Sequence, residues 1–213
     1  MVKKHMPSPL GHALAGLAAA WSADLISPER SRRTSTPGTP GTAGNRRASL
    51  FDRAGGALTV ICMGLAVAPD LDLLFHAHRS VTHSLSAVAA TTIVAAGVTG
   101  WVTRRPSWRV ALMCGGAYAT HLLLDWLAAD PYWPYGIQIF WPFNDAWYLS
   151  GVNLFPGTER LRVFSFRTMR INLLAMAWET AILFPLVVLL WLVRVKALAR
   201  LAPEVPGSDH SAQ

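Results

Sequence analysis

Long apolar runs, separated by short polar stretches, constrain this chain more than any other feature of its sequence. Residues 81–102, 110–127 and 171–193 each approach the length that a helix needs to cross a bilayer. A fourth run, 54–68, reaches that length if it continues to Phe75. Only 15% of the residues are charged, whereas soluble domains contain about a quarter. We therefore expect an all-α integral membrane bundle of about four to five helices.

The amino-terminal region is expected to add a further helix. Residues 1–26 carry two lysines before an apolar stretch, which is also the pattern of a signal peptide. His12 inside this stretch, and the apolar helices that follow, favour a retained helix. Residues 27–53 are rich in Pro, Gly, Ser, Thr and Arg and predict a disordered basic loop. The bundle then occupies 54–200, and 201–213 is predicted to be a disordered tail.

The net charge of +7 admits two interpretations, nucleic-acid binding or contact with anionic lipid head groups. The arginines flank the apolar runs, so the lipid bilayer is the expected partner and nucleic acid is not. The two cysteines, Cys62 and Cys114, lie inside apolar runs, where buried thiols are expected and a disulfide is not.

Carboxylates and histidines that interrupt the apolar pattern are the candidates for a functional site, because ionisable groups in membrane helices are costly. Asp70 and Asp72 follow an apolar helix and suit a divalent cation. The alternative is a solvated helix end with an Asx turn. His78, Arg79 and His83 come next, where a metal or an anion would find ligands. Here the alternative is an ordinary helix start, capped by Ser80 or Thr82.

A third pair, His121 and Asp125, is spaced i, i+4 and shares one helix face. The pair can bind one ion, or it can form an intrahelical hydrogen bond that satisfies both polar groups. His12 on the first helix is, by itself, more typical of a structural histidine. Successive membrane crossings nevertheless bring all of these clusters to the same side of the bundle. This shared level favours one common metal site.

In their order along the chain, these motifs resemble those of the predicted membrane-bound, metal-dependent hydrolases of the YdjM type. They are Pro-Asp-x-Asp (69–72), His-Arg-x-x-Thr-His-Ser (78–84), His-x-x-x-Asp (121–125) and Gly-x-x-x-x-Trp-Pro (136–142). The early His12 is also similar, and the likeness covers about 6–145 without the loop 27–53. The family usually has Gly at the position of Ser80, and the final helix carries no recognisable motif. A likeness to zinc-dependent phospholipase C, through His and Asp ligands on helices, is more distant.

The resemblance implies a hydrolase in the inner (plasma) membrane, without indicating its substrate. We expect a divalent Zn, Mn or Fe ion, because mixed His and carboxylate ligands suit these metals better than Ca. His78 and Arg79 are the candidate catalytic residues, with Arg79 stabilising a phosphoryl or carboxyl oxygen. A site at membrane level suggests a phosphoester or lipid-linked substrate. The candidate metal ligands are His12, Asp70, Asp72, His83, His121 and Asp125.

Two other functions fit the same residues. In the first, the protein is not an enzyme, and a structural metal or ion pairs hold its helices together. In the second, Asp70, Asp125 and Glu179 relay an ion across the membrane, although Glu179 is expected in the middle of its span, away from the site. The aromatic connection 130–169 suits the lipid head-group layer, or a lid over the site. No oligomeric state is predicted.

Overall fold

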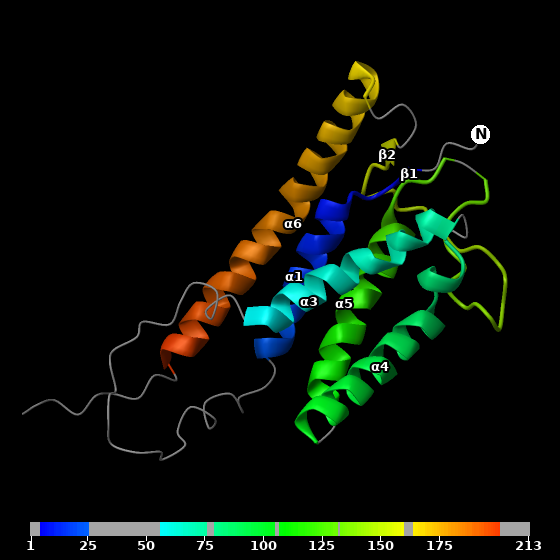
Figure 1. Cartoon of the computed structure of the whole chain (residues 1–213). Helices are drawn as coiled ribbons and strands as arrows, with labels where there is room; N and C mark the ends of the chain where they lie inside the picture. Colours follow the sequence, from blue (N-terminus) through cyan, green and yellow to red (C-terminus); the bar gives the residue numbers. More distant parts are fainter. Residues whose placement is uncertain are drawn as a thin grey trace, which may run out of the picture.

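The computed structural model describes residues 5–25, 56–75, 79–104, 107–131, 133–159 and 164–200. Most of them lie in α-helices, so the predicted all-α bundle is confirmed (Figure 1). The predicted loop 27–53 and tail 201–213 lie outside the described residues. The α-helices are α1 (Pro9–Leu25), α3 (Gly56–Val67), α4 (Leu85–Thr103), α5 (Trp108–Leu127) and α6 (Phe166–Arg200).

Four segments are long and apolar enough to cross a membrane, judged by length and composition. Each overlaps one of the four runs that the sequence predicts, which confirms a multi-pass arrangement. Helix α6 continues through Pro185, as membrane helices often do, because neighbouring groups can satisfy the freed backbone carbonyl. The four segments are Gly56–Leu73, Leu85–Thr103, Trp108–Leu127 and Phe166–Lys196.

Two short 3-10 helices modify the predicted boundaries. Helix η2 (Ala68–Phe75) continues α3 past the carboxylates, as expected. Helix η3 (Val81–His83) precedes α4, which therefore begins at Leu85 rather than at Val81. The start of α4 is capped by Ser84, whose side-chain oxygen accepts a hydrogen bond from the Ala87 N–H. The cap is thus neither Ser80 nor Thr82.

Helix α1 occupies the centre of the bundle. It packs against α3, α5 and α6, whereas α4 packs mainly on α5. Figure 1 shows α1 between α6 and α5, with α3 crossing over them in that view. Because α1 touches three neighbours, a polar side chain on it can meet residues from distant parts of the sequence.

Glycine allows α1 and α3 to approach closely. A Cβ added at Gly16 would lie 2.6 Å from the Ala66 Cβ and 2.8 Å from the Cys62 carbonyl oxygen. Small residues at helix contacts are typical of membrane bundles, where close backbone packing replaces the hydrophobic effect. Cys62 and Cys114 are buried and form no disulfide, as predicted.

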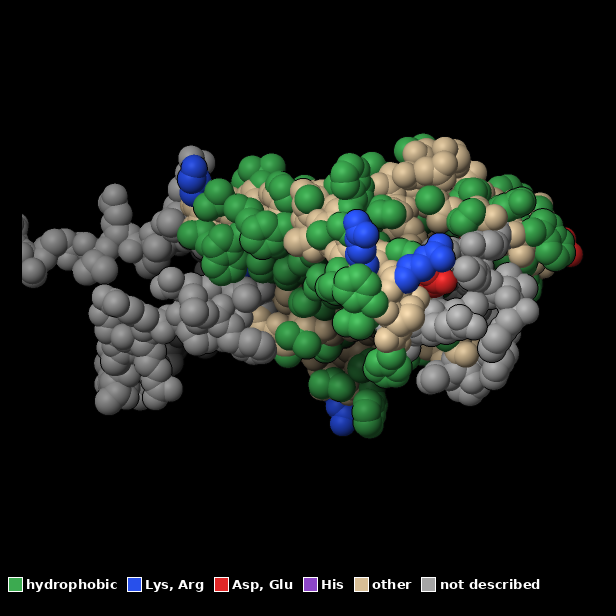
Figure 2. All heavy atoms as spheres, turned by 90° about the horizontal axis from the view of Figure 1, so that it is seen from above, with side chains coloured by type: hydrophobic (Ala, Val, Ile, Leu, Met, Phe, Trp, Pro, Cys, Tyr) green, Lys and Arg blue, Asp and Glu red, His purple; other side chains and the backbone are tan. Residues whose placement is uncertain are grey.

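The outer surface of the helices is apolar. Figure 2 shows hydrophobic side chains over much of the long helices, with few charged groups between them. On α4, Ile93 and Trp101 are 66% and 80% exposed. Such exposure suits contact with lipid rather than with water. The structure is therefore consistent with a bilayer as the surrounding medium.

The connection between α5 and α6 folds back onto the bundle at one end. The two-residue strands β1 (His5–Met6) and β2 (Thr158–Glu159) pair antiparallel and join this connection to the start of α1. The Ala129 N–H donates to the Phe155 carbonyl at 2.8 Å. Phe143 is 91% exposed and Trp133 is 76% exposed. Aromatic side chains exposed beside apolar helices suit the head-group layer.

Candidate metal centre

The six predicted metal ligands come together at one end of the bundle. They come from four elements, and all six are buried. The prediction of one shared level is therefore matched by the geometry. Helix α1 supplies His12, η2 supplies Asp70 and Asp72, η3 supplies His83, and α5 supplies His121 and Asp125.

Two imidazole nitrogens and two carboxylates face a common point. His83 Nε2 lies 3.1 Å from His121 Nε2. Asp125 Oδ2 lies 3.3 Å from His83 Nε2 and 3.4 Å from His121 Nε2. Asp70 Oδ1 lies 4.0 Å from His83 Nε2 and 3.7 Å from His121 Nε2. Ligand atoms about 2.0–2.1 Å from a tetrahedral ion are separated by roughly 3.3 Å, so this set fits a single small cation.

His12 contacts the other oxygen of Asp125. Its Nε2 lies 3.5 Å from Asp125 Oδ1. Its ring stacks on that of His121, with centroids 3.8 Å apart and an interplanar angle of 19°. Two groups therefore have a geometry that could hold a metal: His12, His121 and Asp125, and Asp70, His83 and His121.

Hydrogen bonds to the outer ring nitrogens fix which nitrogen faces the centre. His121 Nδ1 donates to the Ala66 carbonyl at 2.8 Å. His83 Nδ1 lies 3.2 Å from Asp72 Oδ2. The two Nε2 atoms are therefore the ring nitrogens that face each other, 3.1 Å apart, where a shared proton or a metal ion would stabilise them. Asp72 thus contacts the ring nitrogen of His83 that faces away from His121. The prediction that Asp72 binds the metal directly stays a prediction.

Asp72 is itself held by its neighbours. The Thr82 hydroxyl donates to Asp72 Oδ2 at 2.6 Å, and the Arg79 backbone N–H donates to the same oxygen at 3.2 Å. Metal-binding histidines usually donate their second N–H to a carboxylate or a carbonyl. The Thr-His pair of the motif therefore provides one candidate ligand, His83, and a hydroxyl that holds Asp72.

Pro69 explains why the Ala66 carbonyl is available to His121. In a 3-10 helix each N–H donates to the carbonyl three residues earlier. Pro69 has no N–H, so the carbonyl of Ala66 receives no such bond where α3 changes into η2. The His121 imidazole supplies a donor there instead. The proline of the Pro-Asp-x-Asp motif thus contributes to the metal centre through the main chain.

The electrostatic environment favours a cation. Burial lowers the pKa of His83, but hydrogen bonds and charges from Asp125 and Asp72 outweigh burial and raise this pKa to about 9. Both Asp125 oxygens are buried without a well-formed hydrogen bond in the described part of the chain. A buried carboxylate in this state is expected to bind a cation. The donor set therefore fits a divalent metal.

The candidate catalytic residues are less clearly placed. His78 lies outside the described residues. Arg79 has a positive φ of 69°, and its guanidinium forms a buried ion pair with Asp130. The predicted role of Arg79, stabilising a substrate oxygen, stays a prediction. The observed contact instead joins the turn before η3 to the aromatic connection.

Asp130 also explains the glycine of the Gly-x-x-x-x-Trp-Pro motif. The Gly136 N–H donates to Asp130 Oδ2 at 2.9 Å. Gly136 has a φ of +84°, and the Tyr148 carbonyl occupies the position that a Cβ would need. The sequence analysis did not identify Asp130, although its position before a proline at the start of the aromatic stretch could have marked it.

The sequence also missed the relationship between Ser8 and Glu179. The Ser8 N–H donates to Glu179 Oε1 at 2.9 Å, and the Ser8 hydroxyl donates to Glu179 Oε2. Ser8 lies one helical turn before His12, so Glu179 is at the level of the site. The expectation that it lies away from this level is wrong. An ion relay through Asp70, Asp125 and Glu179 stays a prediction.

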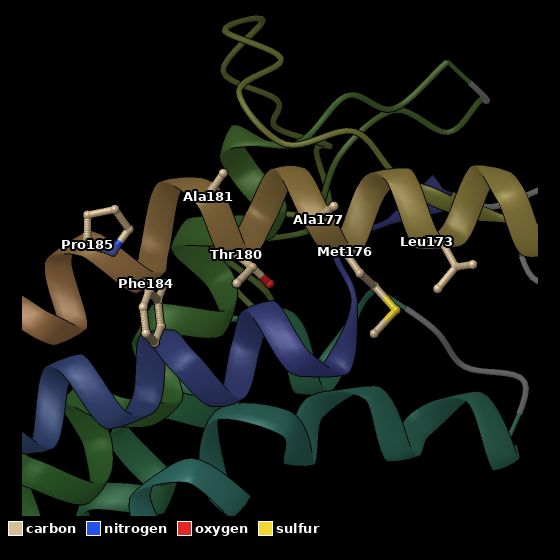
Figure 3. A pocket seen from close by; sticks show the side chains of 7 residues that line it. All are labelled: Leu173, Met176, Ala177, Thr180, Ala181, Phe184 and Pro185. Atoms are coloured by element: carbon tan, nitrogen blue, oxygen red, sulfur yellow. The ribbon is translucent and has the colours of Figure 1, made fainter.

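An open apolar groove lies on a different part of the bundle. Figure 3 shows its lining side chains along α6, with Thr180 and Phe184 pointing toward the side of α1. None of the six candidate ligands lines this groove. The lining residues are Leu173, Met176, Ala177, Thr180, Ala181, Phe184 and Pro185.

Comparison with known proteins identifies one family. The model of a family described as "YdjM inner membrane protein" matches residues 6–201 of this chain. No curated protein matches, and no solved structure matches. The match extends beyond residue 145, where the recognisable motifs end, and includes the whole of α6.

Proposed function

This chain belongs to the YdjM inner membrane protein family, and we propose that it is a membrane-embedded, metal-dependent hydrolase. The observation that carries the proposal is the convergence of His83 Nε2, His121 Nε2 and the Asp125 carboxylate within 3.1–3.4 Å of one another. Two imidazole nitrogens and a carboxylate buried this close together form a donor set that a cation would stabilise. His12 and Asp70 would complete the ligand set.

A divalent metal at this point would lower the pKa of a water molecule and polarise the bond to be broken. The residues of the chain prepare the site for it. Asp72 and the Ala66 carbonyl orient the two imidazoles, so that little reorganisation is needed when the ion binds. Mixed histidine and carboxylate ligands favour Zn, Mn or Fe.

The proposed substrate is a phosphoester, free or linked to a lipid. Its support is the location of the ligands at the end of the bundle where the aromatic connection folds back. Exposed Trp133 and Phe143 on this connection suit the head-group layer. A lipid phosphate lies in the same layer. Arg79 and His78 are retained as the proposed groups for binding the substrate oxygens.

A structural metal is the second candidate, and one observation favours it. His12, His83 and His121 are each 0% exposed, and Asp125 is 5% exposed. A structural site is coordinatively closed, whereas a catalytic site keeps one position open. In this alternative the ion holds α1, η2, η3 and α5 together and carries out no chemistry.

Metal analysis of the detergent-purified protein tests both candidates. We expect about one Zn, Mn or Fe per chain in the wild type and in Asp145→Asn, a change at an exposed carboxylate. A His121→Ala/Asp125→Ala variant should contain none. If a folded wild type binds no metal when Zn²⁺, Mn²⁺ or Fe²⁺ is supplied, both candidates are wrong.

Hydrolysis assays then separate the enzyme from the structural protein. The wild type, loaded with metal, is supplied with phosphomonoesters, phosphodiesters and phospholipids in mixed micelles. The enzyme predicts product release that disappears in the His121→Ala/Asp125→Ala variant. If bound metal stabilises the fold but the protein hydrolyses none of the three substrate classes, the hydrolase proposal is wrong and the structural metal is supported.

A further inference from the structure

Glu179 is the one acidic residue of the last described helix, and it is 1% exposed. A carboxylate in a membrane helix is costly unless its charge is compensated. The structure shows the compensation: both oxygens accept hydrogen bonds from Ser8, one from the backbone N–H and one from the hydroxyl. Ser8 directly precedes α1, so the carboxylate lies at the amino-terminal end of that helix.

This end of α1 favours an anion. The first backbone N–H groups of a helix lack carbonyl partners within the helix and carry a partial positive charge. The Ser8 hydroxyl also accepts a hydrogen bond from the Gly11 N–H at 3.1 Å. Glu179 therefore stabilises the first turn of α1 through Ser8, and it connects α6 to that turn.

The carboxylate of Glu179 packs closely against Gly11 in the first turn of α1. A Cβ at this position would lie 2.5 Å from Glu179 Oε2 and 3.1 Å from the carboxyl carbon. A larger residue at this position would force the carboxylate of Glu179 to shift away from the first turn of α1. The next residue is His12, whose backbone N–H donates to the Ser8 carbonyl at 3.2 Å. The contact with Glu179 is thus one residue from a proposed metal ligand.

We propose that Glu179, through Ser8, is a positioning residue that sets the height and rotation of His12 at the metal centre. The proposal rests on the metal site described under the proposed function. His12 must bring Nε2 to within 3.5 Å of Asp125 while its ring stacks on His121. A small rotation of α1 would break both contacts. The last helix, which carries no recognisable motif, thereby acts on the centre without touching it.

Cobalt binding tests the proposal without any assay of activity. Co²⁺ is titrated into the detergent-purified, metal-free full chain, and its visible spectrum reports the ligand set. We expect Glu179→Ala to weaken Co²⁺ binding by roughly 10–100-fold, the usual effect of losing an outer partner of a metal ligand. Its spectrum should match that of His12→Ala. Ser8→Ala should change the Co²⁺ affinity and the spectrum in the same direction as Glu179→Ala. Ser8→Thr, which keeps the hydroxyl, should have the affinity and spectrum of the wild type.

Leu183→Ala is the matched control. Leu183 is buried in the cluster that contains Ala15 of α1 and Leu124 of α5, so its loss weakens packing without touching Ser8 or Glu179. It should lower stability and keep the wild-type cobalt spectrum. If Leu183→Ala changes the spectrum as Glu179→Ala does, the effect is general packing and the proposal is wrong.

Two other results are decisive. A wild-type spectrum and affinity in both Glu179→Ala and Ser8→Ala would overturn the positioning role and leave the metal site intact. If Glu179→Ala does not fold, Ser8→Ala, which keeps the Ser8 N–H, decides between the outcomes. A folded wild type that binds no Co²⁺ would overturn this proposal together with the metal site.

Discussion

Asp72 Oδ2 lies 3.2 Å from His83 Nδ1, on the side of the imidazole opposite the nitrogen that faces His121. The carboxylate therefore acts on the metal centre from behind the ring. This distinguishes it from Asp70, whose Oδ1 faces the ligand nitrogens directly. Two carboxylates separated by a single residue of η2 thus contact different nitrogens of the candidate site.

Asp72→Asn should weaken metal binding by roughly 10–100-fold, because the amide orients His83 less strongly than a carboxylate. The stoichiometry of one metal per chain should not change. Calorimetric titration with Zn²⁺ measures both quantities. Asp70→Asn should cost more, since it replaces the charged oxygen of a proposed direct ligand with a weaker neutral one, and the exposed Asp145→Asn should have no effect. Equal losses in the Asp70 and Asp72 variants would contradict the assignment.

Asp130→Ala should destabilise the protein by about 3–5 kcal/mol, because it leaves the Arg79 guanidinium buried without its carboxylate. Reversible unfolding in detergent micelles gives the free energy. The double variant Arg79→Ala/Asp130→Ala should lose less than the sum of the two single variants. Additive losses would mean that the two side chains do not stabilise each other.

Gly136→Ala should lower stability by more than Gly151→Ala. Both glycines have positive φ values, 84° and 73°, and that backbone conformation costs a residue with a Cβ roughly 1–2 kcal/mol. Only at Gly136 does a neighbouring carbonyl occupy the Cβ position, whereas nothing lies within 4 Å at Gly151. The difference in melting temperature between the two variants measures the cost of the contact between the added Cβ at residue 136 and the Tyr148 carbonyl. Equal melting temperatures would contradict this prediction.

Gly16→Ala should weaken the contact between α1 and α3, at a cost of about 1–3 kcal/mol for overpacking. Gly64→Ala is the matched control on α3, because nothing lies within 4 Å of its added Cβ. It should leave stability unchanged or raise it slightly. Since α1 carries His12, Gly16→Ala should also weaken metal binding. The idea fails if both variants bind Zn²⁺ and unfold like the wild type.

The sequence predicted the spans, and it identified six polar side chains that the structure brings together, because both depend on local patterns. Apolar runs of about twenty residues indicate membrane helices, and the i, i+4 spacing placed His121 and Asp125 on one face. Helix boundaries were less accurate. Several hydroxyl residues before α4 are equally good cap candidates by sequence. In the structure the Thr82 hydroxyl donates to Asp72, and Ser84 caps the helix by accepting from the Ala87 N–H.

The pairings that the sequence missed depend on contacts between distant segments. Glu179 and Ser8 are 171 residues apart, and neither lies in a recognisable motif. Arg79 and Asp130 are 51 residues apart. No periodicity encodes such pairs, because each becomes visible only when the helices pack. The sequence also did not predict that Asp70 and Asp72 contact different ring nitrogens, since this difference depends on the 3-10 conformation of η2.

The contribution of α1 to the centre has a consequence for biogenesis. His12 leaves the ribosome before His121 and Asp125 have been synthesised, so α1 carries a polar side chain whose partners on α5 do not yet exist. The six candidate ligands can come together only after α5 has been synthesised and has packed against α1. Their convergence is therefore a late event in folding, and a chain that stops before α5 lacks two of the six.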